Sequence, residues 1–239
     1  MSDYEWTQVP AKAWEIGLRV SEARALAELT AQRAREATAP TQPHLERERA
    51  QLAAMWGNPD YLFAQLAHSM PAHTVQLPAF SITKTPVTLA QFTRFRIETD
   101  ALPRSTHNTD AARPLPPAIP DPGQPVTGLA WFEAAAFANW ARCELPNEAM
   151  WEAALRPASR SPFGVISEEL FEWCADEFAP YPGSDKIAVG RIEPPHGGWW
   201  GTRTRRGGAV PGLPVTVVAR GGADPSLRLR DTTFRLVRR

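Results

Sequence analysis

A tryptophan-rich apolar stretch from Pro125 to Arg156 is the feature that most constrains how this 239-residue chain can fold. Two helices fit the stretch, at about 131–142 and 147–156, and Glu144-Leu145-Pro146 separates them. The proline of this linker precedes the second helix, where its missing N–H costs no hydrogen bond, and Asn147 supplies an N-cap side chain. Because 43% of the chain is apolar, a packed core is expected.

The N-terminal part predicts a short strand and turn at 4–17, followed by a helical insertion at about 21–68. Ser21 is a suitable N-cap for a first helix to about Ala37, because Ala, Leu, Glu, Gln and Arg dominate there. Two further helical segments are expected, at 45–56 and 59–68.

Short strands and irregular loops account for much of the remaining chain. Residues 73–82 alternate loosely between apolar and polar side chains, which predicts a strand interrupted at Pro78. Thr88 then opens a helix, and Gln91, three residues on, completes a capping box. Residues 101–125 hold seven prolines and predict a surface loop. The mixture indicates an α+β fold.

Charge and targeting signals narrow the function classes. The net charge is zero, so the whole chain has no electrostatic reason to seek nucleic acid or a membrane surface. The segment from Arg191 onward is different, with ten Arg against three acidic residues. No signal peptide and no apolar run of membrane-spanning length occur, so a cytoplasmic protein with reduced thiols and no membrane partner is expected.

Four blocks of sequence, in fixed order, carry a resemblance to a known family. They are Trp6-x-x-Val9-Pro10-Ala11; His73 to Phe80 with Ile82 to Thr88; Leu145-Pro146-Asn147-Glu148-Ala149-x-Trp151-Glu152; and Phe171-Glu172-Trp173-Cys174-x-Asp176 with Arg220-Gly221-Gly222 and Phe234-Arg235-Leu236. The chain resembles the formylglycine-generating-enzyme (sulfatase-modifying factor) family. The resemblance implies one domain over 1–239 with a C-type-lectin-like α+β fold: short antiparallel strands, flanking helices and much irregular loop.

The catalytic cysteines of the family's oxidases have no counterpart here. In those relatives two cysteines after Arg-Gly-Gly-Ser-Trp bind copper(I), which requires soft thiolate ligands. The chain instead reads Arg220-Gly-Gly-Ala-Asp-Pro-Ser, and neither Cys143 nor Cys174 stands at a catalytic position. The five histidines have no metal-ligand spacing. No catalytic residue and no cofactor are therefore assigned, apart from a weak calcium candidate at Glu172.

A glycine-flanked loop in the basic C-terminal part is the candidate binding surface. Aromatic and arginine side chains gather there, and these residue types dominate interface hot spots. The predicted binding residues are His196, Trp199, Trp200, Arg203, Arg205, Arg206 and Arg220. The alternative is that the tryptophans pin the loop to the core while the arginines face water.

Two functions follow from these observations as hypotheses. The first is a noncatalytic, lectin-like binding or assembly protein that recognises a protein or peptide partner. The alternative is a cysteine-independent oxidoreductase of the same family, acting in natural-product or protein oxidation. Nucleic-acid binding is a third reading, based on the C-terminal charge alone.

Overall fold

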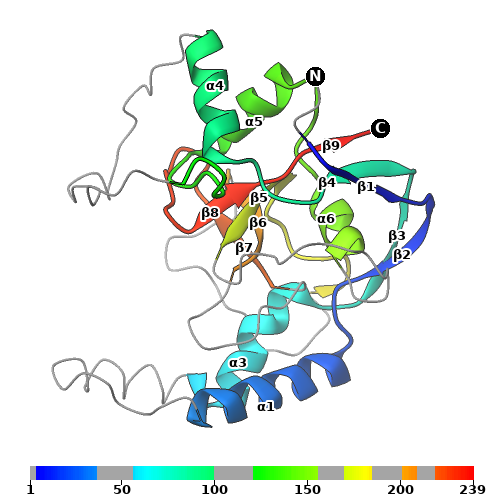
Figure 1. Ribbon diagram of the computed structural model, residues 1–239. Helices are drawn as coiled ribbons and strands as arrows, with labels where there is room; N and C mark the ends of the chain where they lie inside the picture. The colour runs from blue at the N-terminus through cyan, green and yellow to red at the C-terminus, as the bar shows by residue number, and fades with distance from the viewer. Residues whose placement is uncertain (1–3, 37–55, 100–120, 156–169, 185–200, 209–218) are drawn as a thin grey trace, which may run out of the picture.

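The computed structural model describes residues 4–36, 56–99, 121–155, 170–184, 201–208 and 219–239 (Figure 1). It combines helices with small, mostly antiparallel sheets, which is an α+β fold. The helices are α1 (Val20–Glu36), α3 (Pro59–Leu66), the 3₁₀ turn η2 (Ala67–Ser69), α4 (Leu89–Thr99), α5 (Trp131–Trp140) and α6 (Glu148–Leu155).

The described strands form three sheets. They are β1 (Trp6–Val9), β2 (Lys12–Ile16), β3 (His73–Leu77), β4 (Phe80–Thr83), β5 (Phe171–Glu177), β6 (Arg203–Gly207), β7 (Arg220–Ala223), β8 (Thr232–Phe234) and β9 (Val237–Arg238). Their orders are β1-β4-β9, β2-β3 and β7-β6-β5-β8. All pairs are antiparallel except β5 with β8.

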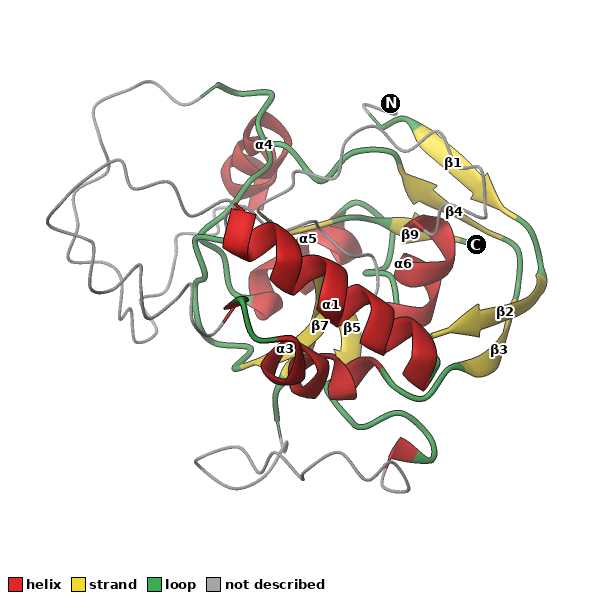
Figure 2. Cartoon of the chain, turned by 90° about the horizontal axis from the view of Figure 1, so that it is seen from below, coloured by secondary structure: helices red, strands yellow, loops and turns green. Residues whose placement is uncertain are grey.

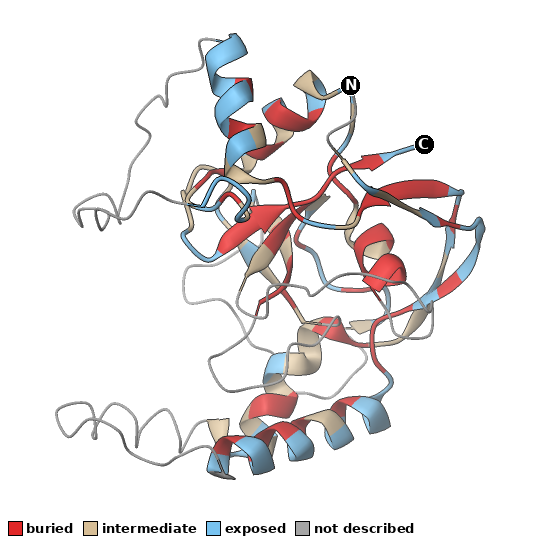
Figure 3. Cartoon of the chain, viewed as in Figure 1, coloured by how far each residue is buried: buried red, intermediate tan, exposed pale blue. Residues whose placement is uncertain are grey.

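The main core lies between the four-stranded sheet and helices α4 and α5. Trp173 of β5 and Phe234 of β8 are fully buried there, and Phe137 of α5 packs edge-on against Phe234 at 5.4 Å between ring centroids. Figure 3 shows the resulting gradient of burial across the sheet, from buried β8 to half-buried β6 and β7. The core therefore covers one side of β5 and β8 and leaves the neighbouring strands partly open.

Helices α1 and α3 form a separate layer with its own apolar cluster, which includes Ala27 and Phe63. Seen from below in Figure 2, the two helices lie against each other in front of the strands. The layer joins the rest of the chain through η2 and through β2 and β3, the antiparallel pair of strands that flank it in the sequence. Gly17, at the end of β2, has φ of +83°, and a Cβ there would meet two backbone oxygens within 2.9 Å, so the turn requires glycine.

Several local predictions are confirmed. The N–H of Thr88 donates to Gln91, whose own N–H donates to the Thr88 hydroxyl, which is the expected capping box. Asn147 accepts from the N–H of Met150 at the start of α6. The strand expected at 73–82 divides into β3 and β4 on either side of Pro78.

Other predictions need adjustment or are not covered. The first helix begins at Val20, one residue before the expected N-cap, because the carboxylate of Glu22 accepts from the N–H of Arg19. The helix expected at 45–56 and most of the loop at 101–125 lie outside the described residues. Within the described residues, no helix is both long and apolar enough to cross a bilayer.

Candidate functional site

The alternation of side chains along β6 decides where the predicted arginines lie. Successive residues of a strand point to opposite faces of its sheet. Arg206 therefore faces α6 and is fully buried, whereas Arg203 and Arg205 point to the other face and are half-buried. We call the first the buried face and the second the open face of the four-stranded sheet.

On the buried face, Arg206 forms an ion pair with Glu152 of α6, and neither side chain is exposed. Its other terminal nitrogen donates to the Tyr181 hydroxyl over 2.8 Å and approaches Glu148 at 3.4 Å. Burial alone would lower the pKa of Arg206, but Tyr181, Glu152 and Glu148 together raise it. This guanidinium thus remains charged and holds α6 onto the sheet.

Arg220 lies beside Arg206, directly opposite it in the β6–β7 register. It binds Glu148 through two nitrogens, Nε at 2.8 Å and Nη2 at 2.6 Å, in the side-on geometry typical of strong Arg–carboxylate pairs. Nη1 donates to the carbonyl oxygens of His68 and Ala179. Arg220 thereby connects β7, α6 and the helical layer.

Glu172, the calcium candidate, belongs to the same buried network and is 1% exposed. Arg235 donates to both of its oxygens, and the indole Nε1 of Trp151 donates to Oε2 over 2.9 Å. Both oxygens are thus directed at groups of the chain itself. The described residues contain no group of three or more His, Cys, Asp or Glu side chains that could hold a metal ion.

The open face has a different character. The guanidinium of Arg205 lies 4.4 Å above the ring of Phe171 and pairs with Asp231 at 3.2 Å. The guanidinium of Arg203 lies 4.2 Å above the ring of Trp131, and its Nη1 donates to the Ala175 carbonyl. Two cations resting on aromatic rings make this face suited to recognition.

The predicted binding residues thus separate into three groups. Arg206 and Arg220 join the buried network, Arg203 and Arg205 line the open face, and His196, Trp199 and Trp200 lie outside the described residues. The carboxylates that neutralise the buried arginines were not singled out from the sequence. Glu148 and Glu152 stand four residues apart in an otherwise apolar helix, a pattern that indicates buried cationic partners.

Both cysteines are free thiols at least partly shielded from solvent. Cys174 of β5 is fully buried, and burial, followed by nearby Asp176, raises the pKa of its thiol well above the usual value. Burial likewise raises the pKa of Cys143, which lies after α5 close to Arg238 and Glu144. Burial therefore disfavours the thiolate form of both cysteines.

A groove of about 460 Å³ lies elsewhere, on the outer side of α4. Leu89, Ile97 and Pro122 contribute its apolar wall, and Arg94 and Glu98 pair with each other along its edge. It shares no lining residue with either face of the four-stranded sheet.

Fold and sequence together define the class of protein: an α+β chain of the formylglycine-generating-enzyme type. The family described as "Sulfatase-modifying factor enzyme 1-like domain" matches residues 36–169, more than half of the sequence. The chain belongs to this family.

Curated relatives with sequence similarity include two proteins named hercynine oxygenase. The one from Mycolicibacterium thermoresistibile is 33% identical over 37% of this chain and 25% of its own length. The one from Mycolicibacterium smegmatis is 26% identical over 71% of this chain and 53% of its own length. The formylglycine-generating enzyme of Streptomyces coelicolor is 29% identical, over 46% and 44%. The chain thus spans between a quarter and about half of these relatives.

Solved structures support the same fold at lower identity. PvdO from Pseudomonas aeruginosa superimposes with a TM-score of 0.59 at 18% identity, covering 98% of this chain and 94% of that one. CarF gives a TM-score of 0.51 at 15% identity, with 98% of each chain covered.

Proposed function

We propose that this chain serves an oxygenase-type reaction of the formylglycine-generating-enzyme family without using a cysteine pair. The similarity to two proteins named hercynine oxygenase carries the proposal. The burial of Cys174 supports the cysteine-independent part, because a buried thiol of raised pKa is a poor nucleophile and a poor metal ligand. The oxidant would be dioxygen, as the name of these relatives implies.

The open face of the four-stranded sheet is the part of the described structure that suits substrate contact. Its Arg203 forms no ion pair with a described carboxylate, whereas the buried arginines pair with Glu148, Glu152 and Glu172. The buried network then has a supporting role: it fixes β6 and β7 relative to α6, so that the open face is held rigid.

The metal content of the protein purified from its natural host tests this proposal. We expect uptake of dioxygen when hercynine and a thiol reductant are added, and stoichiometric iron or copper, for which the described residues offer no group of three or more His, Cys, Asp or Glu ligands. A variant combining Cys143→Ser with Cys174→Ala should retain both properties if it folds. Loss of metal from this folded variant would disprove the cysteine-independent mechanism. A metal-free native protein that consumes no dioxygen would disprove the oxygenase reading.

A noncatalytic binding or assembly role, lectin-like in scaffold, is the second candidate. The composition of the open face favours it, since arginine and aromatic side chains are typical of protein and peptide interfaces. This role predicts a metal-free protein whose affinity for its partner falls when Arg205 is replaced by Ala. If the partner were a nucleic acid instead, affinity would decrease steeply with salt concentration.

A further inference from the structure

Arg203 and Arg205 differ in how their charges are satisfied, although both lie on the open face. Asp231 neutralises Arg205, whose Nη1 also donates to the Thr232 hydroxyl. Arg203 has no ion pair with any described carboxylate; Glu177 stands opposite it in the β5–β6 register without forming one. The single hydrogen bond of its side chain within the described residues goes from Nη1 to the Ala175 carbonyl. Arg203 is therefore a half-buried cation, and some of its guanidinium N–H groups make no hydrogen bond within the described residues.

The position of Arg203 over Trp131 orients those donors. A guanidinium that lies above an aromatic ring keeps its N–H groups directed outward from its edge. With Nη1 used by the Ala175 carbonyl, Nε and Nη2 remain along one edge. That edge has the spacing of a carboxylate, as the side-on contact of Arg220 with Glu148 demonstrates in the same chain.

The strand next to β6 leaves space for a ligand beside this edge. Ala223 is directly opposite Arg203 and Gly221 is opposite Arg205, so both small residues lie on the open face. A Cβ added to Gly221 would meet no atom within 4 Å. Diagonal neighbours on adjacent strands are about 7–8 Å apart, which is within the reach of a small ring attached to a carboxylate.

We propose that Arg203, supported by Trp131, binds the carboxylate of a small organic ligand whose body rests over Gly221 and Ala223. The expected ligand is thus a compact carboxylic acid. This inference rests on the proposed substrate-contacting role of the open face. Trp131 fixes the guanidinium, since its indole nitrogen is itself held by the Cys174 carbonyl at 2.8 Å.

Benzoate and benzamide test the charge requirement, because they differ only in the ionised group. Isothermal titration of the intact chain should give saturable binding of benzoate and at least about tenfold weaker binding of neutral benzamide, as expected for a charge-assisted hydrogen bond. Absence of benzoate binding, or equal affinity for the two compounds, would overturn the proposal.

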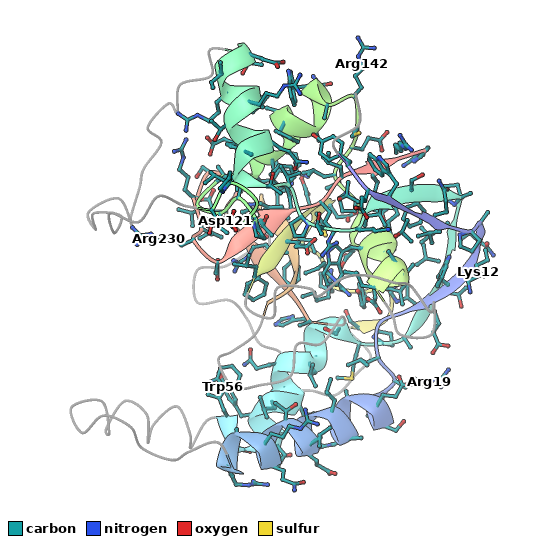
Figure 4. All side chains as sticks on the ribbon, in the orientation of Figure 1. Lys12, Arg19, Trp56, Asp121, Arg142 and Arg230 are labelled. Atoms are coloured by element: carbon teal, nitrogen blue, oxygen red, sulfur yellow. The ribbon has the colours of Figure 1, made fainter. Side chains whose placement is uncertain are left out.

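Substitutions then locate the site. Arg203→Gln should abolish the preference for benzoate, and Arg203→Lys should retain part of it, because lysine keeps the charge but lacks the paired donors. Gly221→Val should block binding while leaving the melting temperature at least as high, since the added side chain enters open space. Arg19→Gln is the matched control and should leave benzoate binding unchanged. Arg19 is exposed, and Figure 4 shows it on the helical layer, near α1. An Arg203→Gln protein that binds benzoate normally would contradict the assignment.

This test is independent of the oxygenase proposal. It requires neither metal nor turnover, so loss of the carboxylate site would leave the metal content and dioxygen uptake to decide the reaction. Conversely, a metal-free protein with an intact benzoate site would retain the site and lose only the oxygenase function.

Discussion

Arg235 donates from Nε to both carboxylate oxygens of Glu172, at 3.0 and 2.9 Å, and neither side chain is more than 1% exposed. The same guanidinium donates to the carbonyl oxygens of Thr83 and Lys84. One arginine near the C-terminus therefore connects the end of β4 with the start of β5. The pair is buried and joins two strands, which gives it a structural role.

Replacing Glu172 by Ala should reduce the free energy of unfolding by about 3–5 kcal/mol, since Arg235 would be left as a buried cation without its counter-ion. Urea denaturation followed by tryptophan fluorescence measures the change. Glu177→Ala, at the exposed end of the same strand, should change stability by no more than about 0.5 kcal/mol. Equal losses of stability in the two variants would show that the buried Glu172–Arg235 pair does not stabilise the fold more than an exposed carboxylate does.

Replacing Arg220 by Lys should loosen the helical layer before the rest of the protein. Lysine retains the charge facing Glu148 but cannot reach the carbonyls of His68 and Ala179 at the same time. The Leu18 amide, which donates to the Ser69 carbonyl, should exchange faster with deuterium, whereas the β1–β4 amides should be unaffected. Unchanged protection of Leu18 would show that the layer is held by other contacts.

The ionisation of Asp176 should contribute to the pH dependence of the free energy of unfolding. Burial raises the pKa of this carboxyl; the N–H of Glu148 opposes the rise, and the Glu148 carboxylate adds to it. A raised pKa means that the folded protein binds the proton more tightly than the unfolded chain. The resulting stabilisation is present below about pH 3.8 and is lost as the pH rises through the folded-state pKa.

The free energy of unfolding of the Asp176→Asn variant, relative to that of the native protein, should therefore be higher at pH 7 than at pH 4. The amide oxygen can still accept from the Glu148 N–H, so the cap of α6 is preserved. Denaturation midpoints at the two pH values give the comparison. A difference of opposite sign would mean that Arg220 stabilises the ionised form more than burial disfavours it.

Alkylation should distinguish the two thiols. Iodoacetamide should modify half-buried Cys143 slowly, because burial raises its pKa, and should leave fully buried Cys174 intact until the protein unfolds. Mass spectrometry of peptides after native and denatured labelling provides the measurement. Rapid native labelling of Cys174 would contradict its burial and weaken the argument for cysteine-independent chemistry.

Local signals in the sequence were sufficient for several elements. The helices at 89–99 and 148–155 follow side chains, Thr88 and Asn147, that cap their own first turns, so the determining contacts are only three residues apart. Pro78 likewise divides a strand by a purely local effect. Sheet order is different, because it depends on pairings such as that of β4 with β9 between distant segments.

The candidate site could be predicted only in part from the sequence, because it also depends on contacts between distant segments. Arg205 and Arg206 are adjacent and chemically identical, yet only Arg206 is buried, since α6 covers its face of β6. The partner Glu152 lies 54 positions away in the chain. Alternation alone says that neighbours face opposite ways; it does not say which face receives a helix.

Arg220 holds the helical layer through the main-chain oxygen of His68 rather than through a side chain. Such a contact is indifferent to the identity of the residue that offers the carbonyl. The hydrogen bond would therefore persist in another helical hairpin that ends in the same turn, provided that the hairpin keeps an apolar cluster of its own and a ring to pack against Phe178. For protein engineers, this makes the segment a natural place to install new recognition elements on an otherwise unchanged domain.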